Sequence, residues 1–249
     1  MIDPLWAGLG AVAGAIAGSF LGTLILRWPE GRGVMRGRSA CDSCGRVLGA
    51  VDLVPMISAL LSRGRCRTCG GKIAPLHGRM EAGCAVIGAL ACGLAPGLVG
   101  AGWALLGWLL LTLAILDWRH FWLPDALTLP LAFLGLTLGL WVTDAALSAR
   151  VIGAAAGYGV LLAVAVSYRM ARGREGLGLG DAKLMGGLGA WFGWQALPFI
   201  LLMAAGIGLV AVLASVALGR KITAATRVPL GTCLAVAAFP GWWVSMLVV

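Results

Sequence analysis

Long apolar stretches recur from one end of this sequence to the other. Eight can be delimited, at about 5–26, 82–98, 103–116, 122–142, 151–168, 184–197, 199–218 and 228–248. A helix needs about 20 apolar residues to cross the hydrocarbon core of a bilayer. With 60% hydrophobic and only 12% charged residues, the chain lacks the polar surface of a soluble domain. We therefore expect an all-α polytopic membrane protein with about eight transmembrane helices.

The stretches 184–197 and 199–218 allow two interpretations. They could form one long buried helix followed by a re-entrant piece, or two crossings with a bend near Pro198. We favour two crossings, because eight spans give the better distribution of charge. With eight spans, 18 of the 19 Lys and Arg residues lie on one side of the membrane and only Arg150 lies on the other. Basic residues are retained in the cytoplasm, so that side is the cytosol and the N-terminus is outside.

The basic residues are concentrated after the first apolar stretch. Ten of the 19 lie between Arg27 and Arg79, among turn-forming and polar residues. No Lys or Arg precedes the first stretch, the reverse of a secretory signal peptide, so it is expected to remain as an anchor. The predicted organisation is a first transmembrane helix (1–27), a cytosolic domain (28–81) and a seven-helix membrane domain (82–249). The net charge of +9 is then explained by topology and anionic lipid, without nucleic acid.

Four of the seven cysteines form two pairs in the predicted cytosolic domain. Their pattern is C-x2-C-x21-C-x2-C, and Gly45 and Gly70 follow the second cysteine of each pair. Two such turns can present four thiolates tetrahedrally to one Zn²⁺ ion, leaving no open position for catalysis. A reducing cytosol disfavours the alternative of two disulfides. The predicted ligands of a structural zinc are Cys41, Cys44, Cys66 and Cys69, while Cys84, Cys92 and Cys233 are expected to be packing residues.

Three carboxylates lie at the ends of apolar stretches. Asp117 closes the third stretch, Asp125 follows it, and Asp181 opens the sixth. The predicted topology places all three at the cytoplasmic face, where an ionisable residue is a functional candidate. Two carboxylates from different helices can share one proton, so that the ionised one activates water and the protonated one binds a peptide carbonyl. Gly178 and Gly180 would let the backbone near Asp181 approach an extended substrate.

The other acidic residues and the histidines have simpler interpretations. Asp125 and Asp181 could be helix N-caps, whereas Asp117 ends a helix, where the dipole disfavours an anion. Asp3 and Asp144 fall on the predicted external side. Solvated loop charges are expected at Glu30, Asp42, Asp52 and Glu175, and loop or interface positions at His77 and His120.

The motifs of this chain resemble those of the prepilin peptidase family in order and over nearly the whole length. The N-terminal motif is Gly18-Ser19-Phe20-Leu21 with Arg27 and Pro29, and the knuckles are Gly37-Arg38-Ser39-x-Cys41-x-x-Cys44 and Arg63-Gly64-Arg65-Cys66-Arg67-x-Cys69. Between and after the knuckles come Asp52-Leu53-Val54-Pro55 and Glu81. The two catalytic motifs are Asp117 with Pro124-Asp125 and Leu127-Thr128-Leu129-Pro130, and Gly178-x-Gly180-Asp181-x-Lys183-Leu184. Two departures are Gly22, where the family commonly has Asn, and Pro75-Leu76-His77-Gly78, in place of a Pro-Arg-Tyr-Pro-like stretch.

The resemblance implies a GxGD-type aspartic endopeptidase of the bacterial inner membrane. Asp117 and Asp181 would be the catalytic pair, and Asp125, Gly178, Gly180 and Lys183 would support it. Such an enzyme cuts the basic leader from prepilin or pseudopilin precursors after a glycine, then methylates the new N-terminus with S-adenosylmethionine. The departures lie beside the region that the family associates with methylation. A local acidic group such as Glu81 would have to attract the basic leader, because the chain itself is basic.

Two other classes of function fit parts of the sequence. A transporter or proton channel would use intramembrane carboxylates, but such proteins usually place them near the bilayer midplane and often show repeated halves. A zinc-bearing membrane adaptor would need no catalytic residue, and the aspartates would be replaceable. The sequence leaves open the precursors, the choice between pilus and secretion system, the S-adenosylmethionine site and the oligomeric state.

Overall fold

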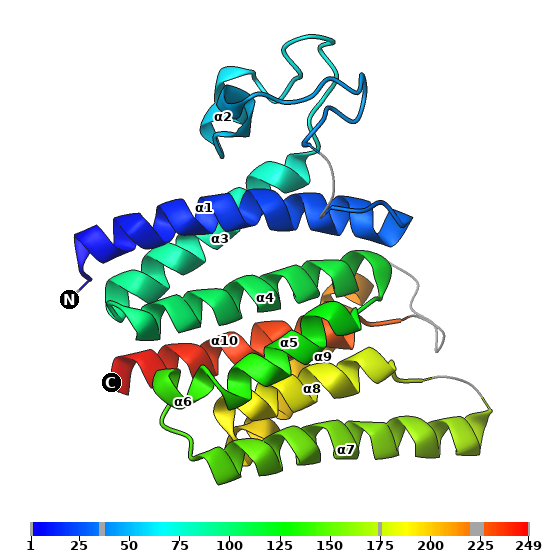
Figure 1. Ribbon diagram of the computed structural model, residues 1–249. Helices are drawn as coiled ribbons and strands as arrows, with labels where there is room; N and C mark the ends of the chain where they lie inside the picture. The colour runs from blue at the N-terminus through cyan, green and yellow to red at the C-terminus, as the bar shows by residue number, and fades with distance from the viewer. Residues whose placement is uncertain (1, 35–37, 174–175, 220–226, 249) are drawn as a thin grey trace. The chain divides into compact units, whose positions relative to one another are not determined.

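The computed structural model describes residues 2–34, 38–173, 176–219 and 227–248, with residues 240–248 as backbone only. Over these ranges the chain is helical, and the extended pairing consists of two isolated bridges, Ala40 with Val47 and Arg65 with Lys72. The chain forms two compact units, Met1–Trp108 and Leu109–Val249. The boundary falls inside the helix α4 (Leu98–His120), so each unit contains part of that helix (Figure 1).

Each predicted apolar stretch corresponds to a helix of 12 or more residues in the described ranges. Besides α4, these are α1 (Pro4–Arg27), α3 (Pro75–Leu94), α5 (Asp125–Leu136), α7 (Leu147–Arg172), α8 (Leu179–Phe192), α9 (Leu197–Ala217) and α10 (Leu230–Val248). Among the residues that the structure describes, 4 helices are long and apolar enough to cross a membrane: α1 with its 3-10 extension, α4, α7, and α9 together with the 3-10 turn before it. The all-α membrane class is therefore confirmed, and the number of crossings stays a prediction.

Besides shifts of several residues at helix ends, two predicted features of the helices differ in the structure. The stretch 122–142 is not one helix, because α5 ends at Leu136 and a short helix α6 (Gly139–Val142) follows. The expected bend near Pro198 is a complete break, since Gly193 has a φ of 78° and a 3-10 turn, η3 (Trp194–Ala196), precedes α9. Pro198 lies in the first turn of α9, where a residue without an N–H is tolerated.

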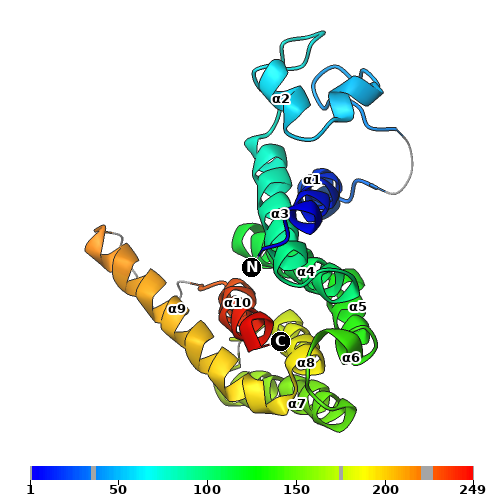
Figure 2. The same cartoon turned by 90° about the vertical axis from the view of Figure 1, so that its left-hand side faces the viewer.

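In the first unit, α1 and α3 cross in close contact through small residues (Figure 2). A Cβ atom added to Gly14 would lie 2.1 Å from the carbonyl oxygen of Cys84, and one added to Gly10 would lie 2.1 Å from that of Gly88. Only glycine permits this approach of two helix backbones, as in small-xxx-small contacts of membrane helices. The buried glycines of α1 recur every fourth residue: Gly10, Gly14, Gly18 and Gly22.

The loop region between α1 and α3 contains η1 (Trp28–Glu30), η2 (Ala50–Leu53) and the short helix α2 (Ile57–Leu61). Its acidic residues form ion pairs. Asp52 is 2.7 Å from Arg46 and 3.5 Å from Arg67, with its side chain only 16% exposed. The expectation that Asp52 is solvated is therefore wrong, because the surrounding arginines enclose it. Glu175 lies outside the described residues.

In the second unit, α8 lies between α5 and α7, and ten of its 14 residues are buried (Figures 1 and 2). A Cβ atom on Gly189 would lie 2.2 Å from the carbonyl oxygen of Gly153, so α7 and α8 also meet through glycines. On the α5 side, the Trp191 indole N–H donates to the Leu131 carbonyl oxygen over 2.9 Å. These contacts hold α8, which has Asp181 in its first turn, within the unit.

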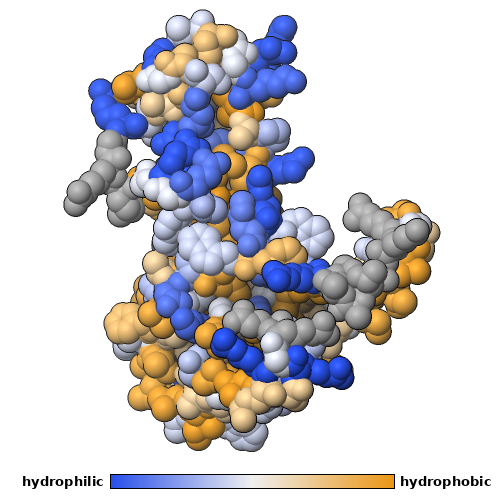
Figure 3. Space-filling model, turned by 90° about the vertical axis from the view of Figure 1, so that its right-hand side faces the viewer, coloured by the Kyte–Doolittle hydropathy of each residue, from blue (hydrophilic) through white to orange (hydrophobic). Residues whose placement is uncertain are grey.

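Large hydrophobic side chains also lie on the outside of the second unit, and orange patches mark such residues on the face shown in Figure 3. In the most apolar part of the helix that η3 and α9 form, only 11% of the residues are buried. Water would disfavour such a surface, whereas lipid tails favour it. Exposed residues of this kind on α7 and α9 include Val151, Val160, Val164, Met170, Phe199, Leu202, Val210 and Leu213.

Arg150, at the start of α7, has a side chain fully enclosed in the second unit. The residue is 0% exposed, and its guanidinium donates a hydrogen bond to the Thr143 hydroxyl oxygen. The planar guanidinium, with five donors in a fixed fork, matches several carbonyl oxygens at the C-terminal ends of helices. Its carbonyl acceptors are those of Gly135, Gly139, Thr143, Ala145, Ala190 and Trp191, at 2.6–3.2 Å. Arg150 therefore connects the ends of α5, α6 and α8.

We expect Arg150→Met to destabilise the protein strongly. Each buried carbonyl left without a donor costs about 1–3 kcal/mol, so the total loss should reach about 3 kcal/mol or more. Thermal unfolding of the purified protein in detergent measures it. Arg172→Met removes an exposed cation from the other end of α7 and should leave the transition unchanged. An Arg150→Met protein as stable as that control would show that the carbonyls do not depend on the guanidinium.

Candidate active site

Asp117 lies in the last turn of α4, with its side chain turned into the second unit. The residue is 4% exposed. Its Oδ2 atom accepts a hydrogen bond from the backbone N–H of Thr232 over 2.7 Å, and the Thr232 hydroxyl lies 3.2 Å from the same oxygen. A buried carboxylate at the C-terminal end of a helix is unfavourable unless other donors reach it. The first turn of α10 supplies those donors.

Asp181 lies in the first turn of α8 and is 8% exposed. Its Oδ1 atom is buried and has no hydrogen-bond partner within the described part of the chain. The charge of Asp117 acts on Asp181, and the backbone N–H of Gly231 lies close to both carboxylates. The structure thus brings together Asp117 and Asp181, which are 64 positions apart in the sequence, at the start of α10.

Asp125 and Lys183, two predicted supporting residues, form an ion pair. Lys183 Nζ lies 2.5 Å from Asp125 Oδ1. The pair joins the first turns of α5 and α8 and is partly exposed. The N-cap interpretation does not hold for either aspartate, because the N-cap residues are Pro124 for α5 and Gly178 for α8, and neither cap has a side-chain hydrogen bond.

The two glycines before Asp181 allow close contacts within the protein, where a side chain would collide with its neighbours. A Cβ atom on Gly180 would lie 2.8 Å from Cβ of Leu123, and one on Gly178 would lie 3.1 Å from Oδ2 of Asp181. Gly180 therefore lets α8 approach the segment before α5, and Gly178 leaves room for the carboxylate. The expected role of Gly178 and Gly180 toward an extended substrate stays a prediction.

The four paired cysteines converge in the first unit. Their sulfur atoms all lie within 4.8 Å of one another, and the Sγ atoms of Cys41 and Cys69 are 3.9 Å apart. A tetrahedron with Zn–S bonds of about 2.3 Å has edges of about 3.8 Å. The donor set and its spacing fit a Zn²⁺ ion held by Cys41, Cys44, Cys66 and Cys69. The cluster could hold a metal ion, and the choice of zinc belongs to the proposal below.

Each cysteine pair is held in a tight turn, as the sequence predicts. The Gly45 N–H donates to the Cys41 carbonyl and the Gly70 N–H to the Cys66 carbonyl, both over 2.9 Å, and the two glycines have φ angles of 70° and 69°. These positive φ angles favour glycine. The remaining cysteines, Cys84, Cys92 and Cys233, are buried, which confirms their prediction as packing residues.

The pKa values of the cysteine thiols depend on the neighbouring thiols and on the backbone N–H groups of the turns. The backbone N–H groups of Cys69 and Thr68 lower the pKa of the Cys66 thiol to about 6. The Gly71 N–H lowers the pKa of Cys69, but contacts with the other three thiols and burial raise it to about 11. Four thiolates cannot all be charged at this spacing without a cation, which a metal ion would supply.

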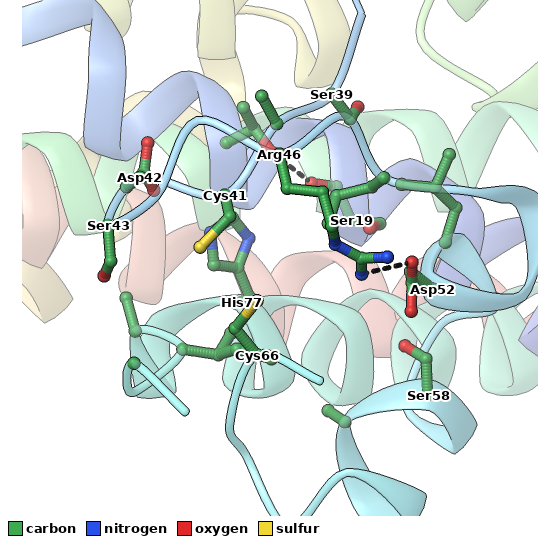
Figure 4. Close-up of a pocket in the computed structure, with 18 of the residues that line it drawn as sticks. Ser19, Ser39, Cys41, Asp42, Ser43, Arg46, Asp52, Ser58, Cys66 and His77 are labelled. Carbon is green, nitrogen blue, oxygen red and sulfur yellow. Dashed lines mark hydrogen bonds and ion pairs between the residues drawn. The ribbon is translucent and has the colours of Figure 1, made fainter. Parts of the chain in front are cut away.

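A cavity of about 340 Å³ lies beside the cysteine cluster, within the first unit. Figure 4 shows Cys41, Cys66 and His77 among the residues that line the cavity, and the ion pair of Arg46 with Asp52. Glu81 also lines the cavity; it is 7% exposed, and its Oε2 atom accepts a hydrogen bond from the Met56 N–H over 2.7 Å. The lining is mixed, with six basic side chains, from Arg27, Arg38, Arg46, Arg65, Arg67 and Lys72. The volume falls in the range of small-molecule sites.

The two departures from the family motifs lie close to each other, and His77 also lines this cavity. A Cβ atom on Gly22 would lie 3.4 Å from Cα and from Nδ1 of His77. A residue larger than glycine at position 22 would meet the histidine, so the two positions are coupled by contact. His77 is thus a cavity residue of α3, while His120 is exposed at the end of α4.

Comparison with known proteins agrees with the motifs. Residues 104–213 match the type IV leader peptidase family, and residues 12–94 match the bacterial peptidase A24 N-terminal domain. A prepilin leader peptidase/N-methyltransferase of Klebsiella pneumoniae is 40% identical over 207 residues, which cover 80% of this chain and 91% of that protein. The chain belongs to the type IV leader peptidase family. The Asp117 and Asp181 carboxylates lie in the first match and the four paired cysteines in the second.

Two further relatives of the same name extend the comparison. One from Burkholderia pseudomallei is 44% identical over 180 residues, covering 70% of this chain, and one from Pectobacterium carotovorum subsp. carotovorum is 35% identical over 246 residues, covering 88% of this chain and 86% of the relative. The aligned region spans 58% of the Burkholderia relative's length. No solved structure matches the chain significantly.

Proposed function

We propose that this member of the type IV leader peptidase family is a membrane aspartic endopeptidase that removes the basic leader from type IV prepilin-like precursors. The observation that carries the proposal is the meeting of two buried carboxylates, Asp117 from α4 and Asp181 from α8. Such a pair hydrolyses a peptide bond without a metal or a nucleophilic side chain. The family match and the names of the relatives supply the substrate class.

The residues of this pair have complementary tasks in the proposed reaction. One carboxylate is ionised and takes a proton from the attacking water, while the other is protonated and hydrogen-bonds the scissile carbonyl oxygen. Because both side chains are buried, water is scarce around them and their interactions with the reacting atoms are strong. The ion pair of Asp125 and Lys183 would hold α5 and α8 in register beside the pair.

We assign the protein to the bacterial inner membrane, with eight crossings, the N-terminus outside, and the 28–81 domain and aspartates at the cytoplasmic face. The support is the distribution of Lys and Arg, 18 of 19 on one side. The Lys- and Arg-rich leader is itself retained in the cytosol by the same rule, so an active site at that face meets it directly. This arrangement also separates the proposal from a transporter, whose carboxylates would lie near the midplane.

The first unit would bind two groups, a zinc ion and S-adenosylmethionine. Zn²⁺ held by the four cysteines would hold its loops together, as structural zinc does where a segment has little core of its own. The relatives' names add N-methyltransferase activity, which uses S-adenosylmethionine as the methyl donor. The cavity beside the cluster is large enough for a molecule of that class, and its arginines and Glu81 fit a ligand with both charges.

Incubation of the purified enzyme with a prepilin-like precursor tests both activities. We expect a product whose N-terminus follows the leader glycine, and a mass increase of one methyl group when S-adenosylmethionine is added. N-terminal sequencing and mass spectrometry read the two events separately. An intact precursor after incubation with well-folded enzyme would contradict the peptidase assignment, and cleavage without methylation would remove only the transferase part.

A further inference from the structure

The first turn of α10 reaches the catalytic pair with its backbone. The Thr232 N–H donates to Asp117 Oδ2 over 2.7 Å, and the Thr232 hydroxyl is 2.9 Å from the Ala114 carbonyl oxygen in α4. The first N–H groups of a helix have no acceptor within the helix, so they are free to serve a carboxylate. The Gly231 N–H is the second such group and lies close to both aspartates.

Glycine at position 231 makes this approach possible. A Cβ atom there would lie 3.1 Å from both Cγ and Oδ2 of Asp117, and 2.7 Å from Cδ1 of Leu123. A larger residue must push either the carboxylate or the start of α10 away. The segment lies beyond residues 104–213, so the family match does not extend to it.

The two aspartates differ in the donors that they receive. Asp117 Oδ2 has both the N–H and the hydroxyl of Thr232. Asp181 has the backbone N–H groups of Gly178 and Gly231 nearby, but its Oδ1 atom is buried without a partner among the described residues. An ionised carboxylate only accepts hydrogen bonds and therefore needs donors, whereas a protonated one carries a donor of its own. A helix N-terminus favours a negative charge, and Asp181 lies at that of its own helix, α8. Asp117 ends α4, where the dipole disfavours an anion, so its charge depends on the N-terminus of α10.

We propose that the first turn of α10, residues 230–232, is a positioning element that holds Asp117 as the charged member of the pair. This inference rests on the proposed peptidase function. Asp117 then takes a proton as the water oxygen bonds to the scissile carbon, and Asp181 gives its proton to the carbonyl oxygen. When the C–N bond breaks, Asp117 returns its proton to the leaving amine and the carbonyl re-forms as Asp181 recovers its own. Gly231 and Thr232 act through Asp117 and do not touch the substrate.

The test is Gly231→Ala, with Gly206→Ala as the matched control. A Cβ atom 3.1 Å from Asp117 Oδ2 requires the carboxylate to shift by a few tenths of an ångström. Because a displacement of about 1 Å costs roughly 100-fold in rate, this smaller shift should lower kcat by about tenfold, with KM changed less than about twofold. A Cβ atom on Gly206 in α9 meets no atom within 4 Å, and this control should cleave at the wild-type rate. Wild-type kcat in Gly231→Ala would overturn the proposal.

A second variant separates the carboxylate from simple crowding. Leu123→Ala removes the side chain that is 2.7 Å from the added Cβ atom, so Gly231→Ala with Leu123→Ala should fold even where the single variant does not. Because the contact with Asp117 remains, the double variant should stay about tenfold slower than Leu123→Ala alone. Recovery to the rate of Leu123→Ala would show a packing role only and overturn the inference. Failure of the proposed function looks different, since the wild-type enzyme itself would not cleave.

Discussion

Replacing either member of the carboxylate pair is expected to abolish precursor cleavage. Asp117→Asn and Asp181→Asn each keep the size of the side chain but remove the acid–base group, which contributes roughly 100- to 10,000-fold to a rate. Because the two residues act as a unit, the double variant should be no slower than either single variant. Cleavage is measured on a purified precursor under single-turnover conditions, with the protein reconstituted in lipid.

The controls use the other aspartates of the second unit. Asp144→Asn changes an exposed residue at the end of α6 and should cleave at the wild-type rate. Asp125→Asn breaks the ion pair with Lys183 and should slow cleavage less than the change of either buried aspartate, because the pair is partly exposed. Full activity of Asp117→Asn or Asp181→Asn would refute the assignment of that residue, provided that the variant unfolds at the wild-type temperature.

Loss of one cysteine ligand is expected to empty the metal site and unfold the loops of the first unit. Structural zinc contributes roughly 10–16 kcal/mol to the folding free energy of small domains. The loops between α1 and α3 have few buried residues, so burial alone would stabilise them much less. Cys66→Ser should therefore lower the zinc content from about one ion per chain to near zero and expose the loops to protease. Elemental analysis and limited proteolysis measure the two effects.

Cys92→Ala is the matched control for the metal. Cys92 is buried in α3 away from the four ligands, and alanine preserves its Cβ atom, so zinc content and protease resistance should stay at the wild-type level. A wild-type protein purified without chelators and found free of metal would contradict the zinc proposal. Cleavage by Cys66→Ser enzyme tells whether the aspartyl site depends on the metal.

The features that could be predicted are those that depend on residues close to one another along the chain. Each apolar stretch became a helix because length and hydropathy are local properties. The cysteine turns were predictable for the same reason, since Gly45 and Gly70 close each turn within a few residues. The break between α5 and α6 at Thr137 and Leu138 was not, because the glycines beside it, Gly135 and Gly139, are also common within continuous membrane helices.

The missed residues depend on contacts between distant segments. Arg150 looked like an ordinary cation because its acceptors are backbone carbonyls of α5, α6 and α8, which no side-chain pattern reveals. Thr232 lies 115 positions from Asp117, and its role depends on a backbone N–H, which every residue except proline has. The one available signal was Pro229-Leu230-Gly231 at the start of the last apolar stretch, where a glycine in the first turn of a helix suggests a close approach.

Cross-linking in the membrane tests most directly whether residues 117 and 181 meet. The variant contains Asp117→Cys and Asp181→Cys. It also contains Cys233→Ala, because the native Cys233 thiol lies near both carboxylates and could itself be cross-linked. After treatment with a short bifunctional thiol reagent, mass spectrometry should find the peptides containing positions 117 and 181 joined in most molecules. In the control pair, Asp117→Cys with Asp144→Cys, they should remain separate. Equal cross-linking in the two pairs, or none in either, would contradict the paired carboxylates on which the proposed peptidase depends.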